Sequence, residues 1–297
     1  MKNQLKLMSS LYAFLAVAFW GISFVSAKSV LDELDLFSLI TARFAIGAVF
    51  LLVLLVITRK KIFVSPQYWP HLFILSIIGV FVHQLLQAAA LTSIDASEAG
   101  WLIAFSPVFT VILAVIFLRE SFSFYMLLGM LTAILGVLFI TAFGSGNFVF
   151  PREAGYFFML ASTLNWAVYS ILLKKLDIPY PSLTITFYIS CIGCAVTMPI
   201  FLSNGGLMQL QLLSSSNVWH LLFLGVFVTA IAYWFWGKAL EIMEASIVSN
   251  FMYLEPPVAC LAAMLLLKEE FYMSSALGGI LIIAGVMAIQ ASKNNSG

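Results

Sequence analysis

The sequence contains very little charge. Asp, Glu, Lys and Arg make up only 9% of its 297 residues, whereas they make up about 25% of a typical soluble domain. Apolar residues account for 63% of the chain and aromatic residues for 15%. A chain with so much apolar surface to bury can be neither a soluble globular protein nor an intrinsically disordered one. The composition therefore predicts that lipid surrounds most of the protein.

Charge clusters and metal ligands are also scarce. The net charge is +1 and no basic run is longer than Arg59–Lys61, so the electrostatic footprint of nucleic-acid binding is missing. Cys191 and Cys194 form a C-x-x-C pattern, but it lies in an apolar segment, where small buried thiols are the ordinary interpretation. No phosphate-binding glycine loop occurs. We therefore expect no metal site, no cofactor and no enzymatic activity.

Long apolar segments, in contrast, fill the sequence. A transmembrane helix needs about 20 mostly apolar residues, and the chain supplies ten such windows separated by short segments. We predict an all-α integral membrane protein with ten transmembrane helices and no extramembrane domain. The predicted spans are 10–30, 37–58, 70–91, 96–118, 124–142, 154–174, 181–202, 217–238, 245–267 and 274–291.

The distribution of Lys and Arg predicts the orientation of these spans. With the N-terminus inside, ten Lys and Arg residues fall in cytoplasmic segments and three in outer segments. Cytoplasmic segments of membrane proteins carry the excess of positive charge, so both termini are expected to be cytoplasmic. One alternative concerns the N-terminus, where Lys2, Lys6, an apolar stretch and Val25–Ala27 imitate a cleavable signal peptide.

The two halves of the chain resemble each other. Shifts of 146 or 149 residues align Trp20 with Trp166, Lys28 with Lys174, Pro107 with Pro256, Arg119-Glu120 with Lys268-Glu269, Gly129 with Gly278 and Gly136 with Gly285. Each half holds five spans, and an odd number makes the second half enter the membrane from the opposite side. We therefore predict two inverted five-helix repeats, 1–145 and 146–297.

Inverted repeats give a transporter a means of alternating access, because two equivalent halves can exchange conformations around a site near the midplane. The alternative is that duplication merely built a helical bundle. The glycines of spans five and ten are expected to be points of close helix packing. They are Gly129, Gly136, Gly278, Gly279 and Gly285.

Several short motifs resemble those of a known family. They are Trp20-Gly21, Arg43-Phe44, the turns Leu118–Glu120 and Leu267–Glu269, and the stretch Leu254–Val258. Together with the ten spans, they resemble the EamA family of the drug/metabolite transporter superfamily over essentially the whole chain. The resemblance implies a plasma-membrane carrier, often an exporter of amino acids, with a central cavity lined by spans one, three, four, six, eight and nine. One departure is that Ile189, not Arg, stands opposite Arg43 in the second repeat.

The polar and aromatic residues of those six spans are candidates for the cavity wall, because polar groups in a lipid-embedded bundle tend to face its interior. His83, Gln84 and Gln87, for example, share one helix face. Each candidate has a structural alternative, since amides and hydroxyls often only join neighbouring helices. The candidate substrate-binding residues are Trp20, Ser23, His83, Gln84, Gln87, Trp101, Asn165, Trp166, Tyr169, Tyr233, Trp236, Asn250, Tyr253 and Glu255.

Two charged residues lie deep in predicted spans. Glu255 precedes Pro256-Pro257, which are expected to kink the helix, and it is a candidate to bind a substrate amine or a proton, or else a structural acid. Arg43 is expected to anchor span two by snorkelling or by bonding backbone carbonyls near the outer side. A single deep basic residue also argues against phosphorylated substrates, which are usually bound by Arg clusters or helix N-termini.

The sequence thus predicts a secondary transporter for a small amphipathic metabolite, an amino acid or an amine-like compound, working by alternating access and in the direction of export. The expected partners are this small-molecule substrate, the lipid bilayer and, as a candidate coupling ion, the proton. An intramembrane enzyme and a non-transporting channel or scaffold are the alternatives.

Overall fold

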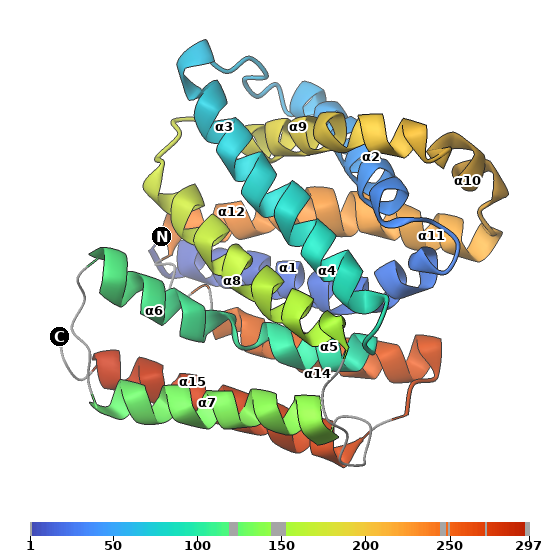
Figure 1. Cartoon of the computed structure of the whole chain (residues 1–297). Helices are drawn as coiled ribbons and strands as arrows, with labels where there is room; N and C mark the ends of the chain where they lie inside the picture. Colours follow the sequence, from blue (N-terminus) through green and yellow to red (C-terminus); the bar gives the residue numbers. More distant parts are fainter. Residues whose placement is uncertain are drawn as a thin grey trace.

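The computed structural model of the chain is a bundle of helices (Figure 1). It describes residues 2–118, 124–143, 153–243, 248, 250–270 and 272–294. Every regular element within these ranges is helical, so the predicted all-α class is confirmed. The start of α1 (Lys2–Leu31) and the end of α15 (Met273–Asn294) lie at the same end of the bundle (Figure 1).

The elements follow the predicted spans closely. The remaining elements of the first half are α2 (Leu36–Ile57), η1 (Pro66–Tyr68), α3 (Trp69–Ser76), η2 (Ile77–Val82), α4 (His83–Leu91), α5 (Ala96–Ile103), α6 (Ser106–Leu118) and α7 (Phe124–Phe143). Those of the second half are α8 (Ala154–Lys175), α9 (Ser182–Ser203), α10 (Gly206–Leu212), α11 (Ser215–Phe223), η3 (Leu224–Ala232), α12 (Tyr233–Ile242), η4 (Asn250–Leu254), α14 (Glu255–Ala262) and η5 (Ala263–Leu267).

Within the described residues, six helical segments are long and apolar enough to cross a membrane, which makes the chain a multi-pass membrane protein. They are Leu7–Leu31, Leu36–Ile57, Pro66–Leu91, Ala154–Lys175, Ser182–Ser203 and Ser215–Ile242. Shorter apolar helices occupy Leu127–Ile140, Phe251–Leu267 and Met273–Gly285. The ten-helix inverted repeat remains a prediction.

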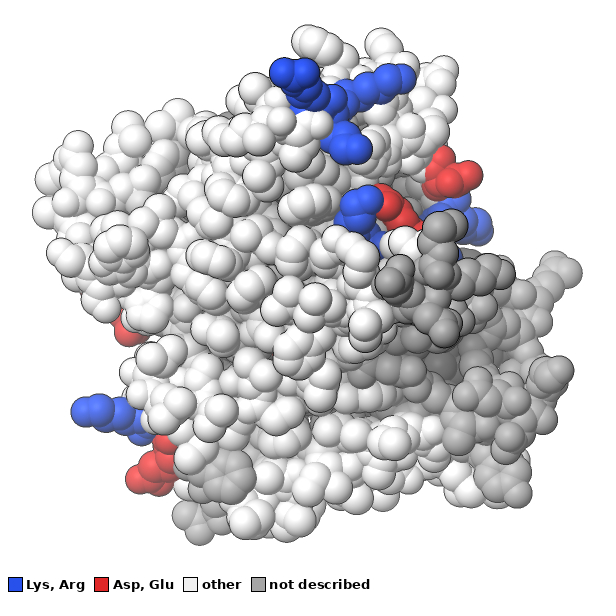
Figure 2. Space-filling view, turned by 180° about the vertical axis from the view of Figure 1, so that it is seen from behind, with Lys and Arg blue, Asp and Glu red and all other residues white. Residues whose placement is uncertain are grey.

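The outer surface has the character that lipid requires. Large apolar side chains such as Val49, Leu135 and Phe157 are 64%, 60% and 71% exposed, which a soluble protein would avoid over so wide an area. On the described part of the face shown in Figure 2, Lys, Arg, Asp and Glu gather near two opposite edges and leave a broad uncharged belt between them. The charges therefore lie where water meets the bundle.

Helices α7 and α15 lie side by side along one side of the bundle (Figure 1). A Cβ atom on Gly136 would meet the carbonyl oxygen of Gly278, and one on Gly285 would meet that of Gly129. The glycines therefore let the two backbones touch, as predicted for close packing in lipid. Gly279 differs, because the ring of Trp101 in α5 covers it.

Two helical segments are interrupted at places that a shift of 149 residues relates. In the first half α5 ends at Ile103 and α6 begins at Ser106, just before a proline. In the second half the 3₁₀ turn η4 ends at Leu254 and α14 begins at Glu255, again just before a proline. Proline removes a backbone donor and favours a new helix start, so the interruption predicted at Pro256-Pro257 is confirmed.

A second matched irregularity is a π-helical segment in each half. Residues 77–82 form η2. The positions 149 residues further along the chain, 226–231, fall within η3. Such segments occur frequently at functional sites. In both halves the next residue, His83 or Tyr233, belongs to the cavity described below.

Candidate functional site

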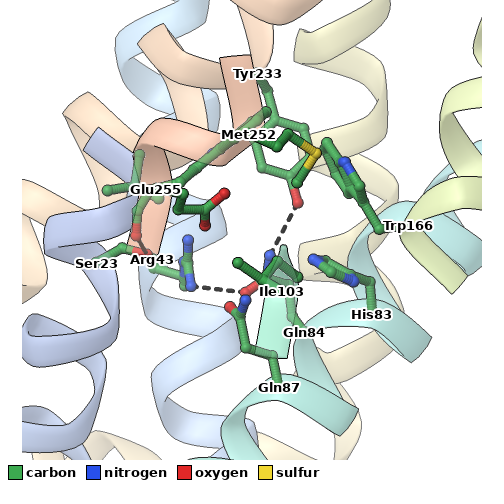
Figure 3. A pocket seen from close by; sticks show the side chains of 12 residues that line it. Ser23, Arg43, His83, Gln84, Gln87, Ile103, Trp166, Tyr233, Met252 and Glu255 are labelled. Atoms are coloured by element: carbon green, nitrogen blue, oxygen red, sulfur yellow. Dashed lines mark hydrogen bonds between the residues drawn. The ribbon is translucent and has the colours of Figure 1, made fainter. Parts of the chain in front are cut away.

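A buried cavity lies between helices of both halves of the chain (Figure 3). It is lined by Trp20, Ser23, Arg43, His83, Gln84, Gln87, Ile103, Trp166, Val228, Tyr233, Met252 and Glu255. The cavity volume is only about 20 Å³, which is about enough for one water molecule. The cavity is therefore contracted in this conformation, and a metabolite could enter only if the walls moved apart.

A chain of hydrogen bonds crosses the cavity wall. Arg43 donates from Nη1 to Gln84 Oε1 (2.8 Å) and from Nε to the hydroxyl of Thr229 (3.1 Å). Gln84 donates from Nε2 to the Tyr233 hydroxyl (2.9 Å), which donates to the carbonyl of Gly79 in η2 (3.1 Å). The network links α2, α4 and α12 and orients the Gln84 amide, because each end of that amide has a defined partner.

The expectation that Arg43 snorkels toward the outer side is wrong. Its side chain is 2% exposed and lines the cavity, where its partners are side chains instead of backbone carbonyls. Snorkelling places a charge in water along an apolar stem. Here the polar side chains of Gln84 and Thr229 replace water inside the bundle.

Aromatic rings form one side of the cavity. Trp20 and Trp166 meet edge to face with centroids 4.9 Å apart, and Trp20 lies 5.8 Å from Tyr233. Behind them, Trp236 is 5.1 Å from Trp20 and Tyr169 is 5.1 Å from Trp166. Edge-to-face geometry turns the positive rim of one ring onto the negative face of another, so these rings hold one another in place and form a preorganised wall.

His83 and Glu255 occupy different environments within the cavity. His83 Nδ1 lies 2.9 Å from the hydroxyl of Ser162, and its ring packs against Trp166. Glu255 begins α14 and is 2% exposed, and its Oε2 atom has no hydrogen-bond partner in the described residues. An unpartnered buried carboxyl oxygen is energetically costly, which makes Glu255 a candidate to contact a ligand.

A cluster of charged residues, which we name the Lys28 latch, joins three helices at one end of the bundle. Lys28 Nζ at the end of α1 contacts Asp95 Oδ1 (2.6 Å) and Glu269 Oε1 (3.1 Å). Glu269, which follows η5, accepts hydrogen bonds from the backbone N–H groups of Ala96 and Ser97 and from the Ser97 hydroxyl. A carboxylate on the first N–H groups of α5 also meets the positive end of that helix.

Two larger hollows, of about 380 and 330 Å³, lie near the ends of α2, α8 and α12. Lys60 and Lys238 line the first hollow and Lys174 lines the second, while Tyr180 and Glu241 line both. In Figure 1 the ends of α2 and α8 lie at the opposite end of the bundle from the start of α5. The latch and the hollows therefore belong to opposite ends.

The structure brings most of the predicted site residues together. Those that line the cavity are Trp20, Ser23, His83, Gln84, Gln87, Trp166, Tyr233 and Glu255, and Tyr169 and Trp236 stand directly behind them. Asn165 instead donates to the carbonyl of Ile78 (2.6 Å), and Trp101 packs against Gly279. Tyr253 lies in η4 and is not part of the wall. The side chain of Asn250 lies outside the described residues.

Several residues of interest are not among the predicted set. Arg43 stands out in the sequence as a deep charge in an apolar span, but the sequence alone favours an anchoring role for it. In the latch, Lys28 lies 67 positions from Asp95 and 241 positions from Glu269 along the sequence. The spacing of residues along one helix cannot predict contacts between positions so far apart. No group of three His, Cys, Asp or Glu side chains in the described ranges is arranged to hold a metal ion.

Comparison with known proteins identifies the family of the chain. The EamA-like transporter family matches residues 7–142 and again residues 153–290. A transporter of Archaeoglobus fulgidus, itself named "Uncharacterized transporter", is 29% identical over 93% of this chain and 96% of its own length. A Streptantibioticus cattleyicolor protein named "Probable terminal-alkyne amino-acid exporter" is 28% identical over 96% and 94%.

Further similarity extends to another bacterial protein and to a solved structure. The Bacillus subtilis protein named "Uncharacterized transporter YetK" is 26% identical over 98% of this chain and 89% of its own length. A crystal structure with 19% sequence identity has a TM-score of 0.71 and covers 97% of this chain and 98% of its own, which shows the likeness of fold. The two family matches together span most of the sequence, and the chain therefore belongs to the EamA-like transporter family.

Proposed function

We propose that the protein is a secondary transporter that moves a small amphipathic metabolite, an amino acid or an amine-like compound, outward across the plasma membrane. The observation that carries this proposal is the central cavity, whose aromatic and polar walls come from both halves of the chain. Aromatic faces bind apolar groups and organic cations, while Gln84, Gln87 and Ser23 offer hydrogen bonds to small polar groups. A cavity of this composition suits an amphipathic ligand.

The proposed architecture is ten transmembrane helices in two inverted repeats, 1–145 and 146–297, with both termini cytoplasmic. Its support is the pairing of irregularities between the halves. The interruption before Ser106 matches that before Glu255, and the π segment η2 matches η3. Interrupted helices at corresponding places of two halves surround the substrate site in many secondary transporters.

Alternating access is the proposed mechanism, in which the two ends of the pathway open in turn. The Lys28 latch joins α1, α5 and the segment after η5 at one end, and the hollows near Lys60 and Lys174 lie at the other. In the proposed orientation the latch is at the outer end. We therefore assign this conformation to a state closed toward the outside, with a contracted cavity.

Counterflow in proteoliposomes tests the transport function directly. Liposomes containing the purified full-length protein are preloaded with unlabelled compound, and uptake of the radiolabelled compound is followed for L-phenylalanine, L-leucine and phenethylamine. A carrier gives saturable uptake that preloading accelerates. A channel gives uptake that neither saturates nor depends on preloading, and a scaffold or an enzyme gives no uptake above that of empty liposomes.

A further inference from the structure

Two oppositely charged side chains face the central cavity without being paired with each other. Arg43 comes from α2 and Glu255 from the start of α14, and each is 2% exposed. Figure 3 shows both side chains at the cavity. Within the described part of the chain, neither takes part in an ion pair shorter than 4.0 Å.

Arg43 has donors to spare for a ligand. A guanidinium carries five N–H donors, and those of Arg43 bond only to the neutral acceptors Thr229 and Gln84 among the described residues. These bonds hold the side chain in place but leave its charge uncompensated. A guanidinium in a fixed position is suited to bind a carboxylate through two parallel hydrogen bonds.

Glu255 presents the complementary chemistry. Its Oε2 atom is buried and has no hydrogen-bond partner in the residues that the structure describes. Removing an ionised carboxyl group from water is costly unless a cation and hydrogen-bond donors replace the water. An ammonium group supplies both the charge and the donors.

We propose that the cavity recognises the zwitterionic group of an α-amino acid, with Arg43 binding the carboxylate and Glu255 binding the ammonium. This inference rests on the proposed function and names its substrate class. Ile103, Val228 and Met252 line the same cavity beside the Trp and Tyr rings, so the preferred amino acid has an apolar or aromatic side chain. Arg43 belongs to the first half of the chain and Glu255 to the second, so the bound zwitterion bridges the two halves.

Three ligands that share a phenylethyl skeleton and differ in the charged groups that they carry test the proposal on the unmodified protein. Binding of L-phenylalanine, phenethylamine and 3-phenylpropionate to the purified full-length protein is measured by the quenching of Trp fluorescence and by thermal stabilisation. Loss of either ligand charge leaves one buried protein charge unpaired, so the amine and the acid are each expected to bind about 10- to 100-fold more weakly than the amino acid. Equal binding of the amine or of the acid would overturn the proposal.

Charge-neutralising variants assign the two roles separately. Arg43→Gln is expected to bind phenethylamine as well as it binds L-phenylalanine, because the carboxylate has lost its partner. Glu255→Gln is expected to lose the corresponding discrimination against 3-phenylpropionate. Lys61→Gln and Glu270→Gln, which neutralise one exposed positive and one exposed negative side chain, are expected to retain the full preference for the zwitterion. Full preference for the zwitterion in folded Arg43→Gln or Glu255→Gln protein would contradict the assignment.

Different results would contradict zwitterion recognition and the carrier function. Saturable counterflow of phenethylamine that equals that of L-phenylalanine would remove zwitterion recognition and leave the carrier function standing. Absence of saturable exchange for all three ligands, in protein shown to be folded by its thermal transition, would remove the carrier function and the zwitterion proposal with it.

Discussion

Trp166 is the residue on which most of the cavity wall depends. Its ring contacts Trp20, Tyr169, Tyr233 and His83, with centroid distances between 4.9 and 5.7 Å. Its indole N–H has no hydrogen-bond partner in the described residues, although Trp usually finds one when buried. The ring therefore offers a ligand both an apolar face and a free donor.

Replacing Trp166 or Trp20 with Ala is expected to weaken substrate affinity by about 1–3 kcal/mol, because the stacking surface is lost. Affinity is measured by concentration-dependent counterflow, and the thermal transition shows whether the variant remains folded. Trp219→Ala is the control, since that side chain is 73% exposed and lies outside the cavity. If both cavity variants kept the affinity of the unmodified protein, the rings would be structural only.

Trp166 and Arg43 show how far residue type alone predicts which side chains face the cavity. Helical spacing of polar and aromatic residues points to Trp166, Gln84 and Tyr233, which line the cavity, because such residues avoid lipid and so reveal the inner face of a helix. The same reasoning did not predict the role of Arg43. A long flexible side chain can turn toward an interface or into a cavity, and only its partners, Gln84 and Thr229, decide between the two.

Among the elements, α1, α5 and the segment after η5 are joined by the Lys28 latch. Lys28→Met keeps the length of the side chain but removes both ion pairs. Because the Lys28 and Asp95 side chains are 26% and 49% exposed, we expect a shift of only about 1 kcal/mol toward the conformation open to the outside. That shift corresponds to an increase of about fivefold in the reaction of a cysteine at Ser23 with a membrane-impermeant maleimide added outside.

Lys238→Met provides the matched control for the latch, because it removes the Lys238–Glu241 ion pair at the opposite end of the bundle. This control is expected not to increase labelling from outside. If the cysteine at Ser23 reacted with the external maleimide as slowly in the Lys28→Met protein as in the protein with an unmodified latch, the ion pairs of Lys28 would not close the outer end.

The pair formed by α7 and α15 depends on backbone contact. A side chain at Gly278 would meet the Gly136 carbonyl and Ile140, and backbone cannot move aside as a flexible side chain can. Gly278→Val is therefore expected to destabilise the protein by about 1–3 kcal/mol, measured as a lower thermal transition in detergent. Ala284→Val adds similar bulk at an exposed position of the same helix, and equal destabilisation by both variants would contradict the close-packing role.

The elements also show how far the sequence determines the fold. The lengths of the apolar segments predict where the helices lie. Pro256 predicts the interruption before α14, because the effect of proline on the backbone is local. No comparable residue in the sequence predicts the π segments η2 and η3, since these segments depend on how neighbouring helices pack. The latch has the same limit, because its partners come from three separate helices.

At the scale of the whole molecule, the proposed orientation makes a prediction about sidedness. Single cysteines near Lys60 and Lys175 are expected to react with an impermeant maleimide only from the cytoplasmic side, and cysteines near Asp32 and Gly146 only from outside. The physical reason is the excess of Lys and Arg on the cytoplasmic side and the odd number of spans in each repeat. The opposite labelling pattern would contradict the inverted-repeat topology.

In the proposed mechanism, one cavity opens alternately to the two sides of the membrane. The test uses Ser23→Cys, a conservative change in the cavity wall, in a protein whose Cys191, Cys194 and Cys260 are replaced by Ser or Ala. An impermeant maleimide is added from either side, with and without L-phenylalanine. We expect labelling from each side, protection by L-phenylalanine, and faster labelling from outside but slower labelling from inside when Lys28→Met is added. Labelling from one side only would contradict alternating access. So would an increase of labelling from both sides at once in the Lys28→Met protein, because that is the behaviour of an open channel.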